Sequence, residues 1–141
     1  MFQRNRTRGF SLIEVLLVLA IIGILSSIAI PSYLGQRRRA RVIGDAISNA
    51  KVIQMALESR KAENGTYGAQ DSYAWTLGVG DAKAKALLPT VSTLGGSKMN
   101  YTLAIDASGV TYTLTAFDPS ISTSVAAYQT NQAGTELIRN Q

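Results

Sequence analysis

The sequence contains no histidine and no cysteine among its 141 residues. Without those side chains the chain can form no Ser-His-Asp triad, no thiol nucleophile and no disulfide bond. Zinc, haem and iron–sulfur centres with their ordinary ligands are excluded for the same reason, and a metal ion could be held only by oxygen atoms. We therefore expect a protein that is not an enzyme and has no cofactor and no metal site. Its length fits one or two small domains.

Charge is also scarce, since charged residues make up 16% of the chain and apolar residues 46%. The 14 Lys and Arg residues outnumber the 9 Asp and Glu residues, for a formal net charge of +5. This is not the composition of a disordered polyelectrolyte.

Residues 10–34 read FSLIEVLLVLAIIGILSSIAIPSYL, with Glu14 as the only charge. At about 1.5 Å per residue, this run makes a helix of about 37 Å, long enough to cross a bilayer.

An apolar run of this kind has three ordinary interpretations: a secretory signal peptide, a membrane anchor or a buried core helix. A secretory signal peptide could be cut after the small residues at positions 27–29, and the basic segment with Arg4, Arg6 and Arg8 resembles the start of an export signal. A plain membrane anchor needs no processing, and a buried core helix of this length is unusual in so small a domain. Glu14 argues against the first two, because a carboxylate within an apolar helix costs up to about 3 kcal/mol. Its presence needs a reason, and the default reason is a partner of opposite charge.

Residues 9–14, Gly-Phe-Ser-Leu-Ile-Glu, resemble the processing signature of type IV pilins and type II secretion pseudopilins. The similarity continues through residues 21–25 and 29–33 and fades after the first two-fifths of the chain. It implies that a dedicated membrane peptidase cuts after Gly9 and that Phe10, the first mature residue, is N-methylated. It also implies that the leader of residues 1–9 lies in the cytoplasm and the C-terminal domain outside. The basic residues on both flanks of the run do not decide that orientation by themselves.

The resemblance gives Glu14 a role in assembly, in which its carboxylate pairs with the Phe10 α-amine of a neighbouring subunit. In the apolar interior of a filament the amine created by cleavage needs an anion, and Glu14 is the only acid within reach. Removing one partner of such a buried pair strands the other charge, at a cost of about 3–5 kcal/mol. We therefore interpret Glu14 as the residue that sets the register of each incoming subunit.

Gly23 and Pro31 weaken the long helix. Glycine costs about 1 kcal/mol in a helix interior and proline about 3 kcal/mol. Pro31 clashes with the carbonyl of Ser27, while the Ser26 and Ser27 hydroxyls can bond the freed backbone groups. In pili of this family the corresponding span is locally unwound, and we expect the same of residues 23–31. A simple proline kink is the alternative.

Beyond Tyr33 the apolar pattern changes from all-round to one-sided. At about 100° per residue the apolar residues fall on one stripe of an amphipathic helix: Val42, Ile43, Ala46, Ile47, Ala50, Ile53 and Leu57. The helix should end near Asn64, because Gly65 suits the left-handed position after the last turn. A helix over residues 10–64 would be about 82 Å long. Its first half must be buried in membrane or in other subunits, and Val52 and Met55, opposite the stripe, are candidate subunit contacts.

Residues 65–100 show no sustained period. We expect a long connection there, pinned to the head by Tyr67, Tyr73 and Trp75, with a short helix over residues 82–88. Residues 101–105 and 110–115 then alternate with period two around a turn at 106–109, which predicts a hairpin. Tyr101, Leu103 and Ile105 should share one face, and Val110, Tyr112 and Leu114 another. Further strands are expected at residues 125–130 and 135–139.

These elements predict an α+β fold, with three to four antiparallel strands packed on the stripe of the long helix. The resemblance implies the same pilin architecture. The expected organisation is a cleaved leader (1–9), a transmembrane or filament-core helix (10–34), an amphipathic helix (35–64), a connecting region (65–100), and a sheet with the C-terminal region (101–141).

The chain departs from the family pattern near its C-terminus. Many pilins close that region with a disulfide, which this chain cannot form. Strand pairing or subunit packing must hold residues 118–141 instead. No dense cluster of Asp residues resembles the calcium loop of major secretion pseudopilins, and this favours a pilus subunit.

A basic cluster follows the apolar run: Arg37, Arg38, Arg39 and Arg41. It could contact nucleic acid or anionic lipid. A solvated or subunit-facing helix surface is the favoured interpretation, because basic residues commonly border a membrane span. DNA binding by the assembled fibre stays an alternative.

The sequence thus favours a major pilin that is processed by the prepilin peptidase and N-methyltransferase and polymerises into a type IV pilus. Its expected partners are copies of itself, the inner-membrane assembly platform, minor pilins, and membrane lipid before assembly. The precursor would reside in the inner membrane and the mature chain in an extracellular filament. A type II secretion pseudopilin in a periplasmic pseudopilus and a minor pilin are the alternatives within the family. A membrane-anchored binding module that never polymerises is the alternative outside it.

Overall fold

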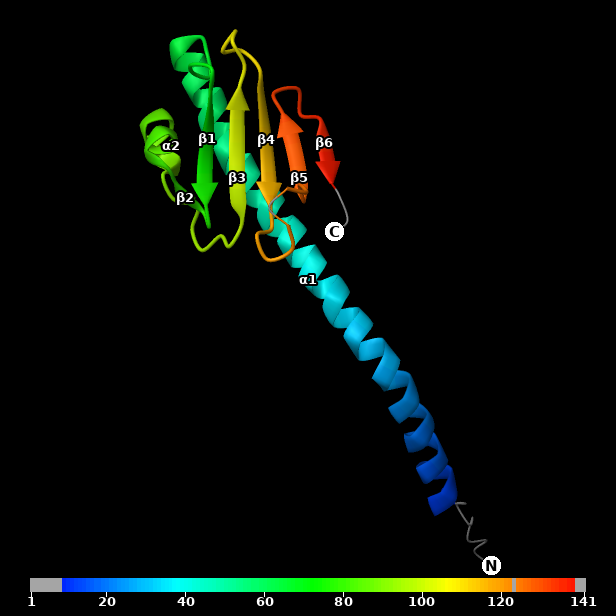
Figure 1. Ribbon diagram of the computed structural model, residues 1–141. Helices are drawn as coiled ribbons and strands as arrows, with labels where there is room; N and C mark the ends of the chain where they lie inside the picture. Colours follow the sequence, from blue (N-terminus) through cyan, green and yellow to red (C-terminus); the bar gives the residue numbers. More distant parts are fainter. Residues whose placement is uncertain (1–8, 123, 139–141) are drawn as a thin grey trace, which may run out of the picture. The chain divides into compact units, whose positions relative to one another are not determined.

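The computed structural model describes residues 9–122 and 124–138. The chain divides into two compact units, residues 1–38 and residues 39–141. Helix α1, Leu12–Asn64, supplies the described helix of the first unit and the first element of the second (Figure 1). Most of the expected leader, with Arg4, Arg6 and Arg8, lies outside the described residues.

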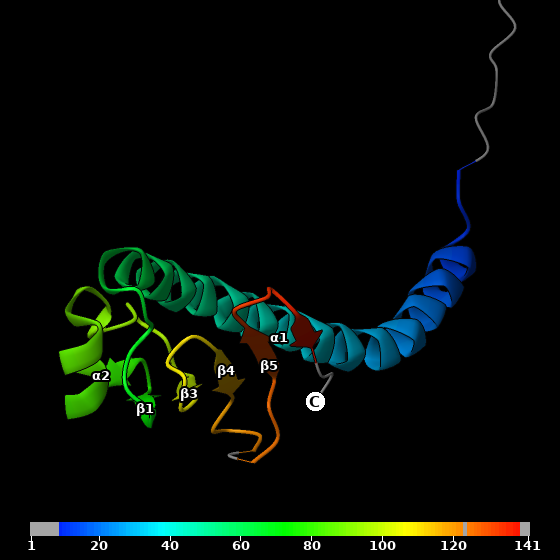
Figure 2. The ribbon, with the colours of Figure 1, turned by 90° about the horizontal axis from the view of Figure 1, so that it is seen from above.

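The second unit, which we call the head, is built on a six-stranded antiparallel sheet in the order β2-β1-β3-β4-β5-β6. The strands are β1 (Asp71–Thr76), β2 (Val79–Gly80), β3 (Asn100–Ile105), β4 (Tyr112–Phe117), β5 (Tyr128–Asn131) and β6 (Glu136–Ile138). Helix α2 (Ala82–Leu87) and a 3-10 turn, η1 (Pro89–Val91), lie between β2 and β3. The C-terminal part of α1 covers one face of the sheet (Figure 2).

The predicted amphipathic stripe is confirmed and forms the helical side of the core. Ala46, Ala50, Ile53 and Leu57 are fully buried, and Val42, Ile43 and Ile47 are partly buried. The helix ends where expected, with Gly65 at a φ of +77° and its N–H bonded to the Lys61 carbonyl at 2.8 Å. Val52 and Met55 are exposed on the opposite side.

The predicted hairpin is confirmed as β3 and β4, with Leu103 paired to Leu114. Tyr101, Leu103 and Ile105 are all buried on the face toward α1. The prediction for the second strand is wrong at one residue. Val110 is exposed and precedes β4, because the turn extends to Thr111, and the buried series on β4 is Tyr112, Leu114 and Ala116.

The region of residues 65–100 contains more structure than the sequence pattern suggested. Tyr67, Tyr73 and Trp75 are buried as expected, and α2 matches the predicted short helix. Two strands, β1 and β2, extend the sheet beyond the three to four that were predicted. Strand β1 offers only two large side chains to the core, so its alternation is short and easily missed.

The turn between β1 and β2 has an unusual residue. Leu77 and Gly78 form a two-residue connection with φ angles of +50° and +76°. Positive φ at both positions is the pattern of a type I′ turn, which normally takes Asn-Gly. Leucine in this left-handed conformation costs about 1–2 kcal/mol, because its Cβ approaches the following carbonyl. The Leu77 side chain is nevertheless 55% exposed.

The other C-terminal predictions shift slightly. Strand β5 begins at Tyr128, later than the predicted residue 125, and β6 covers Glu136–Ile138 of the predicted span. The last residue of that span, Arg139, lies outside the described residues. Pairing of β5 with β4 and of β6 with β5 is the contact that holds this region without a disulfide.

Candidate functional site

The expected cleavage position lies on exposed, non-helical backbone. Gly9, Phe10 and Ser11 precede the first residue of α1, and all three are exposed. The Phe10 side chain is 89% exposed. An added Cβ at Gly9 would meet no atom within 4 Å, so nothing in the described part of the chain requires glycine at this position for packing. A peptidase could therefore reach the bond between Gly9 and Phe10 without unfolding a helix.

The carboxylate of Glu14 caps the first turn of α1. The Ser11 backbone N–H donates to a Glu14 carboxylate oxygen at 2.9 Å, and the Glu14 N–H donates to the Ser11 carbonyl at 3.0 Å. A Glu at the third helical position that bonds the N-cap N–H is one half of a capping box. The negative charge also lies at the positive end of the helix dipole. Glu14 therefore has a structural partner within its own chain, which is a backbone donor and not a cation.

This role was missed in the sequence, although its signal was present. Ser11 and Glu14 have the Ser-x-x-Glu spacing of a capping box, directly before an apolar run. Only one oxygen of the carboxylate bonds the Ser11 N–H. An ionised carboxylate has about four acceptor positions, so Glu14 can keep this contact and still accept from a second donor.

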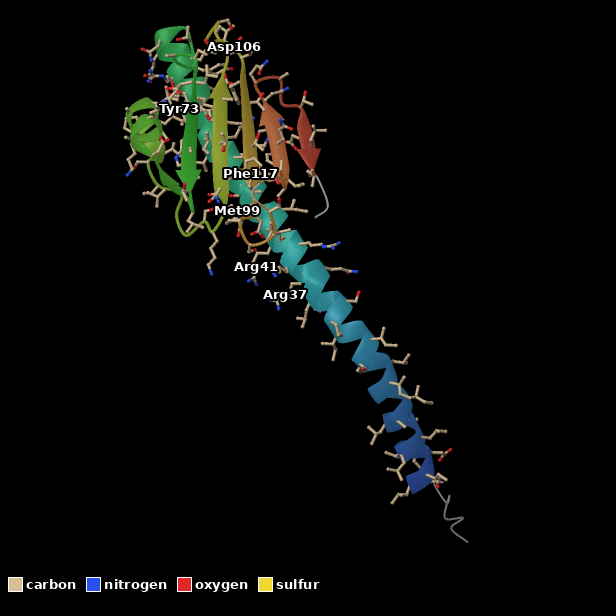
Figure 3. The ribbon with its side chains drawn as sticks, viewed as in Figure 1. Arg37, Arg41, Tyr73, Met99, Asp106 and Phe117 are labelled. Carbon is tan, nitrogen blue, oxygen red and sulfur yellow. The ribbon has the colours of Figure 1, made fainter. Side chains whose placement is uncertain are left out.

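The N-terminal part of α1 presents its apolar side chains outward in every direction. The large apolar residues from Leu12 to Leu34 are 48–77% exposed, and they include Leu16, Leu19 and Ile28. Figure 3 shows side chains projecting from all sides of this part of the helix. Among the described residues, α1 is the one helix that is long and apolar enough to cross a membrane. Burying one such side chain fully is worth about 1.5–3 kcal/mol. The segment therefore requires a lipid or protein environment that the single chain does not provide.

Gly23 and Pro31 lie within the continuous helix α1. Pro31 has no N–H to bond the Ser27 carbonyl, so one backbone hydrogen bond is lost at that turn. At Gly23 an added Cβ would meet no atom of the described chain outside its own turn. The single chain thus stays helical here, and the expected unwinding of residues 23–31 in a filament stays a prediction.

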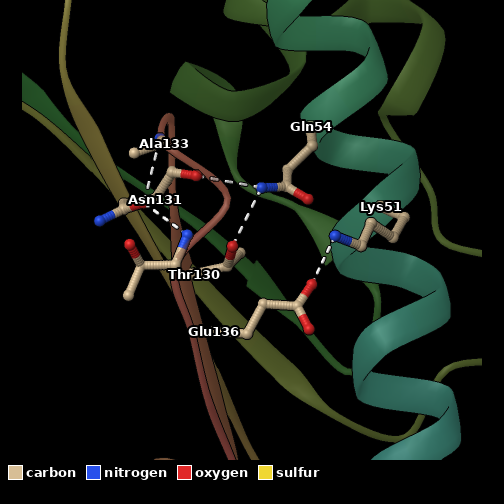
Figure 4. Close-up of polar contacts among 7 residues, drawn as sticks. Lys51, Gln54, Thr130, Asn131, Ala133 and Glu136 are labelled. Carbon is tan, nitrogen blue, oxygen red and sulfur yellow. Dashed lines mark hydrogen bonds and ion pairs between the residues drawn. The ribbon is translucent and has the colours of Figure 1, made fainter.

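Polar contacts join α1 to strands β5 and β6 at one edge of the sheet (Figure 4). The Lys51 ammonium bonds the Glu136 carboxylate on β6 at 2.5 Å. The Gln54 amide donates to the Thr130 hydroxyl at 3.1 Å and to the Asn131 carbonyl at 3.3 Å. The hydrogen bond from Lys51 lowers the pKa of Glu136 below its usual value. These contacts tie β5 and β6 to the helix from which the apolar segment extends.

A shallow groove of about 500 Å³ lies beside these contacts. Its lining mixes charge, amide and apolar groups from α1, β4 and the turn after β5: Lys51, Gln54, Met55, Glu58, Tyr112 and Gln132. Within residues 9–122 and 124–138, no three His, Cys, Asp or Glu side chains are grouped to hold a metal ion.

Residues 4–30 match the family model described as the prokaryotic N-terminal methylation motif. The chain is 35% identical over 65 residues to the type II secretion system core protein G of Aeromonas hydrophila, covering 46% of this chain and 45% of that protein. It is 42% identical over 62 residues to the type IV major pilin protein PilA of Myxococcus xanthus, covering 44% of this chain and 28% of that protein. The N-terminal part of the chain is thus similar to that of type IV pilins and type II secretion pseudopilins. The family match includes Gly9, Phe10, Glu14 and Gly23, the residues singled out above.

Another relative, the fimbrial protein Q of Moraxella bovis, is 35% identical over 71 residues, 48% of this chain and 45% of that protein. The matches thus span less than half the length of each of these three relatives. No solved structure matches the chain. The relatives of this pilin-like chain include proteins named for secretion and proteins named for pili, so they support the family as a whole and both of its branches.

Proposed function

We propose that this chain is a major pilin, which is cut between Gly9 and Phe10 and polymerises into a type IV pilus. The observation that carries the proposal is the outward-facing apolar segment of α1, most of which lies within the residues that match the methylation motif. A helix that is apolar all round is stable only when lipid or other helices cover it. Copies of the same segment can supply that cover in a filament.

In this proposal the precursor sits in the inner membrane and the mature subunit is transferred to the filament. The prepilin peptidase cleaves the exposed Gly9–Phe10 bond, and methylation of the new amine follows. The Phe10 amine of one subunit then pairs with the free carboxylate oxygen of Glu14 in its neighbour. Assembly-platform proteins and minor pilins are the further partners.

The second candidate is a secretion pseudopilin, which is favoured by the similarity to several proteins named type II secretion system core protein G. The chain's lack of a dense Asp cluster near the C-terminus favours the pilus. The two candidates differ in where the polymer is found. A pilus extends from the cell surface, whereas a pseudopilus stays in the periplasm.

Shearing of intact cells tests the proposal. Fibres released by shearing are imaged by electron microscopy, and their main component is identified by mass spectrometry. We expect a fibre whose main component begins at Phe10 with a methylated amine. A chain that is found only in the envelope, with secretion lost on its deletion, would replace the pilus by the pseudopilus. A processed chain that forms no polymer in either place would support the non-polymerising anchor instead.

A further inference from the structure

Two short sequences in the head match the acceptor pattern for N-linked glycans. They are Asn64-Gly65-Thr66 and Asn100-Tyr101-Thr102, each with a threonine hydroxyl two positions after the asparagine. A pattern of three residues also arises by chance, so the sequence alone favours neither. A transferase must reach the asparagine amide from outside, and the structure separates the two sequences on that ground.

The sequence at residues 100–102 is closed. It lies in β3, which pairs with β1 on one side and with β4 on the other. Tyr101, its middle residue, is 0% exposed, and the Asn100 side-chain oxygen accepts from the Leu77 N–H at 2.9 Å. Presenting Asn100 to an enzyme would require an interior strand to leave the sheet.

The sequence at residues 64–66 is open. Asn64 is the last residue of α1, and Asn64, Gly65 and Thr66 are all exposed. Gly65 turns the chain away from the helix with a φ of +77°, and an added Cβ there would meet no atom of the described residues within 4 Å. The Asn64 amide donates to the Arg60 carbonyl at 3.1 Å, an exposed contact within the last turn. Because helix ends fray readily, the amide can leave this contact while the head stays folded.

The chain is fixed directly after this open site. Tyr67 is 1% exposed, its N–H donates to the Gly109 carbonyl at 2.7 Å, and its hydroxyl donates to the Glu58 carboxylate at 2.7 Å. Its ring meets that of Tyr112 edge-on, with the centroids 4.8 Å apart. The site therefore lies at the end of the head that carries the β3–β4 turn (Figure 1). Substitutions at the site leave these buried contacts of Tyr67 in place.

We propose that Asn64 is an acceptor for an N-linked glycan. The donor is a sugar whose anomeric carbon carries a pyrophosphate, which is attached to either a lipid or a nucleotide. The Asn64 amide nitrogen forms a bond to the anomeric carbon, the bond from that carbon to the pyrophosphate oxygen breaks, and the pyrophosphate leaves with the electron pair. The amide nitrogen loses one proton to a base of the transferase, so no oxidant or reductant is needed. The proposal is independent of the choice between pilus and pseudopilus.

Mass spectrometry of the chain purified from the cells that produce it tests this acceptor. Trypsin places the two sequences in separate peptides, residues 62–83 and residues 99–139. We expect a glycan on the first peptide, located at Asn64 by its fragment spectra, and none on the second. The glycan should be lost in Asn64→Gln and Thr66→Ala and kept in Thr66→Ser, which retains the hydroxyl. Thr102→Val is the matched control, because it removes the other acceptor pattern and should keep the glycan.

Two results would overturn the proposal. One is an unmodified peptide of residues 62–83 as the main form of the wild-type chain. The other is a glycan that remains in Asn64→Gln, which would indicate attachment to an oxygen such as that of Thr66. The intact mass also reports N-terminal processing, so a methylated Phe10 with an unmodified Asn64 would refute the glycan alone and leave the proposed function intact.

A second experiment identifies the donor. The full chain, made without glycan and held in detergent, is incubated with washed membranes or with cytosol and a nucleotide sugar. Transfer by the membranes alone supports a lipid-linked donor, and transfer that requires the nucleotide sugar supports a nucleotide-linked one. Asn64→Gln should accept no sugar in either case. Transfer by neither fraction would overturn Asn64 as an acceptor.

Discussion

Substitution of Glu14 separates the two contacts that its carboxylate can make. Glu14→Ala removes both the acceptor for the Ser11 N–H and the negative charge. Glu14→Gln keeps an acceptor for that N–H, because glutamine also serves at this position of a capping box, and removes only the charge. The pair of variants therefore distinguishes a local helix cap from an anionic partner for the Phe10 amine.

The two effects differ in size. Loss of the cap costs the helix start about 0.5–2 kcal/mol, spread over a turn that is exposed in the single chain. In the proposed filament, loss of the anion would leave the Phe10 amine buried without a partner in every subunit contact, at a cost of about 3–5 kcal/mol. The second figure corresponds to a factor of about 10² to 10⁴ in subunit affinity, because about 1.4 kcal/mol is a factor of ten. We therefore expect both variants to lose filaments, although only Glu14→Ala weakens the helix start.

The assay compares three quantities for each variant: the mature Phe10 terminus by mass spectrometry, the membrane-inserted pool by immunoblot, and the yield of sheared fibres. We expect processed, inserted subunits and almost no fibre from both variants. Wild-type fibre yield from Glu14→Gln would refute the charge pairing. Full yield from Gln with reduced yield from Ala would show that the cap alone is the assembly contribution of Glu14.

Three further predictions concern other residues. Replacing Gly9 by leucine should leave the precursor uncut, as seen by intact-mass measurement, and a mature Phe10 terminus from that variant would contradict the proposed cleavage site. Leu77→Asn should stabilise the head by about 1 kcal/mol by relieving its left-handed strain, measured by denaturant unfolding in detergent with tryptophan fluorescence; an unchanged midpoint would contradict the strain. The Ser108 hydroxyl donates to both Asp106 oxygens, at 2.8 and 2.7 Å, and holds the Asp106 pKa at about 2. Because the unperturbed pKa of Asp is 3.8, the ionised Asp106 stabilises the head fully above that pH, and this stabilisation is lost as the pH falls through about 2. Ser108→Ala should raise the Asp106 pKa, which a carbon-detected NMR titration measures. An unchanged pKa would exclude the Ser108 hydroxyl as the cause of the low value.

The sequence predicted those elements whose periodicity is long or strongly alternating. The stripe of α1 recurs over several turns, so its helical spacing alone assigns Ala46, Ala50 and Ile53 to the core, where all three are fully buried. Strands β3 and β4 each alternate over six residues on either side of a turn that contains Gly109. Both signals are local, and the tertiary contacts agree with them.

The additional strands could not be predicted because their local signals are weak. Strand β2 has two residues, which is too few to show a period. Its turn carries Leu77 where a type I′ turn usually shows Asn, so the usual hairpin signal is missing. The buried Trp75 on β1 is explained by distant contacts, including the hydrogen bond from its indole N–H to the Val91 carbonyl at 2.8 Å. Such contacts follow from the three-dimensional arrangement and leave no pattern in a short sequence window.

The exposed apolar segment of α1 changes how filament assembly should be explained. Side chains such as Leu16 and Ile28 would gain much by leaving water, but in the proposed precursor lipid already covers them. Moving a helix from lipid to a bundle of like helices brings no further hydrophobic gain, since lipid tails are as apolar as leucine. What differs between the two environments is packing and polar pairing. A carboxylate within an apolar helix is costly in lipid, so the proposed pairing of Glu14 with a neighbour's Phe10 amine would favour the filament over the membrane. In this proposal, the one charge of the apolar run is the residue best able to drive subunits out of the bilayer.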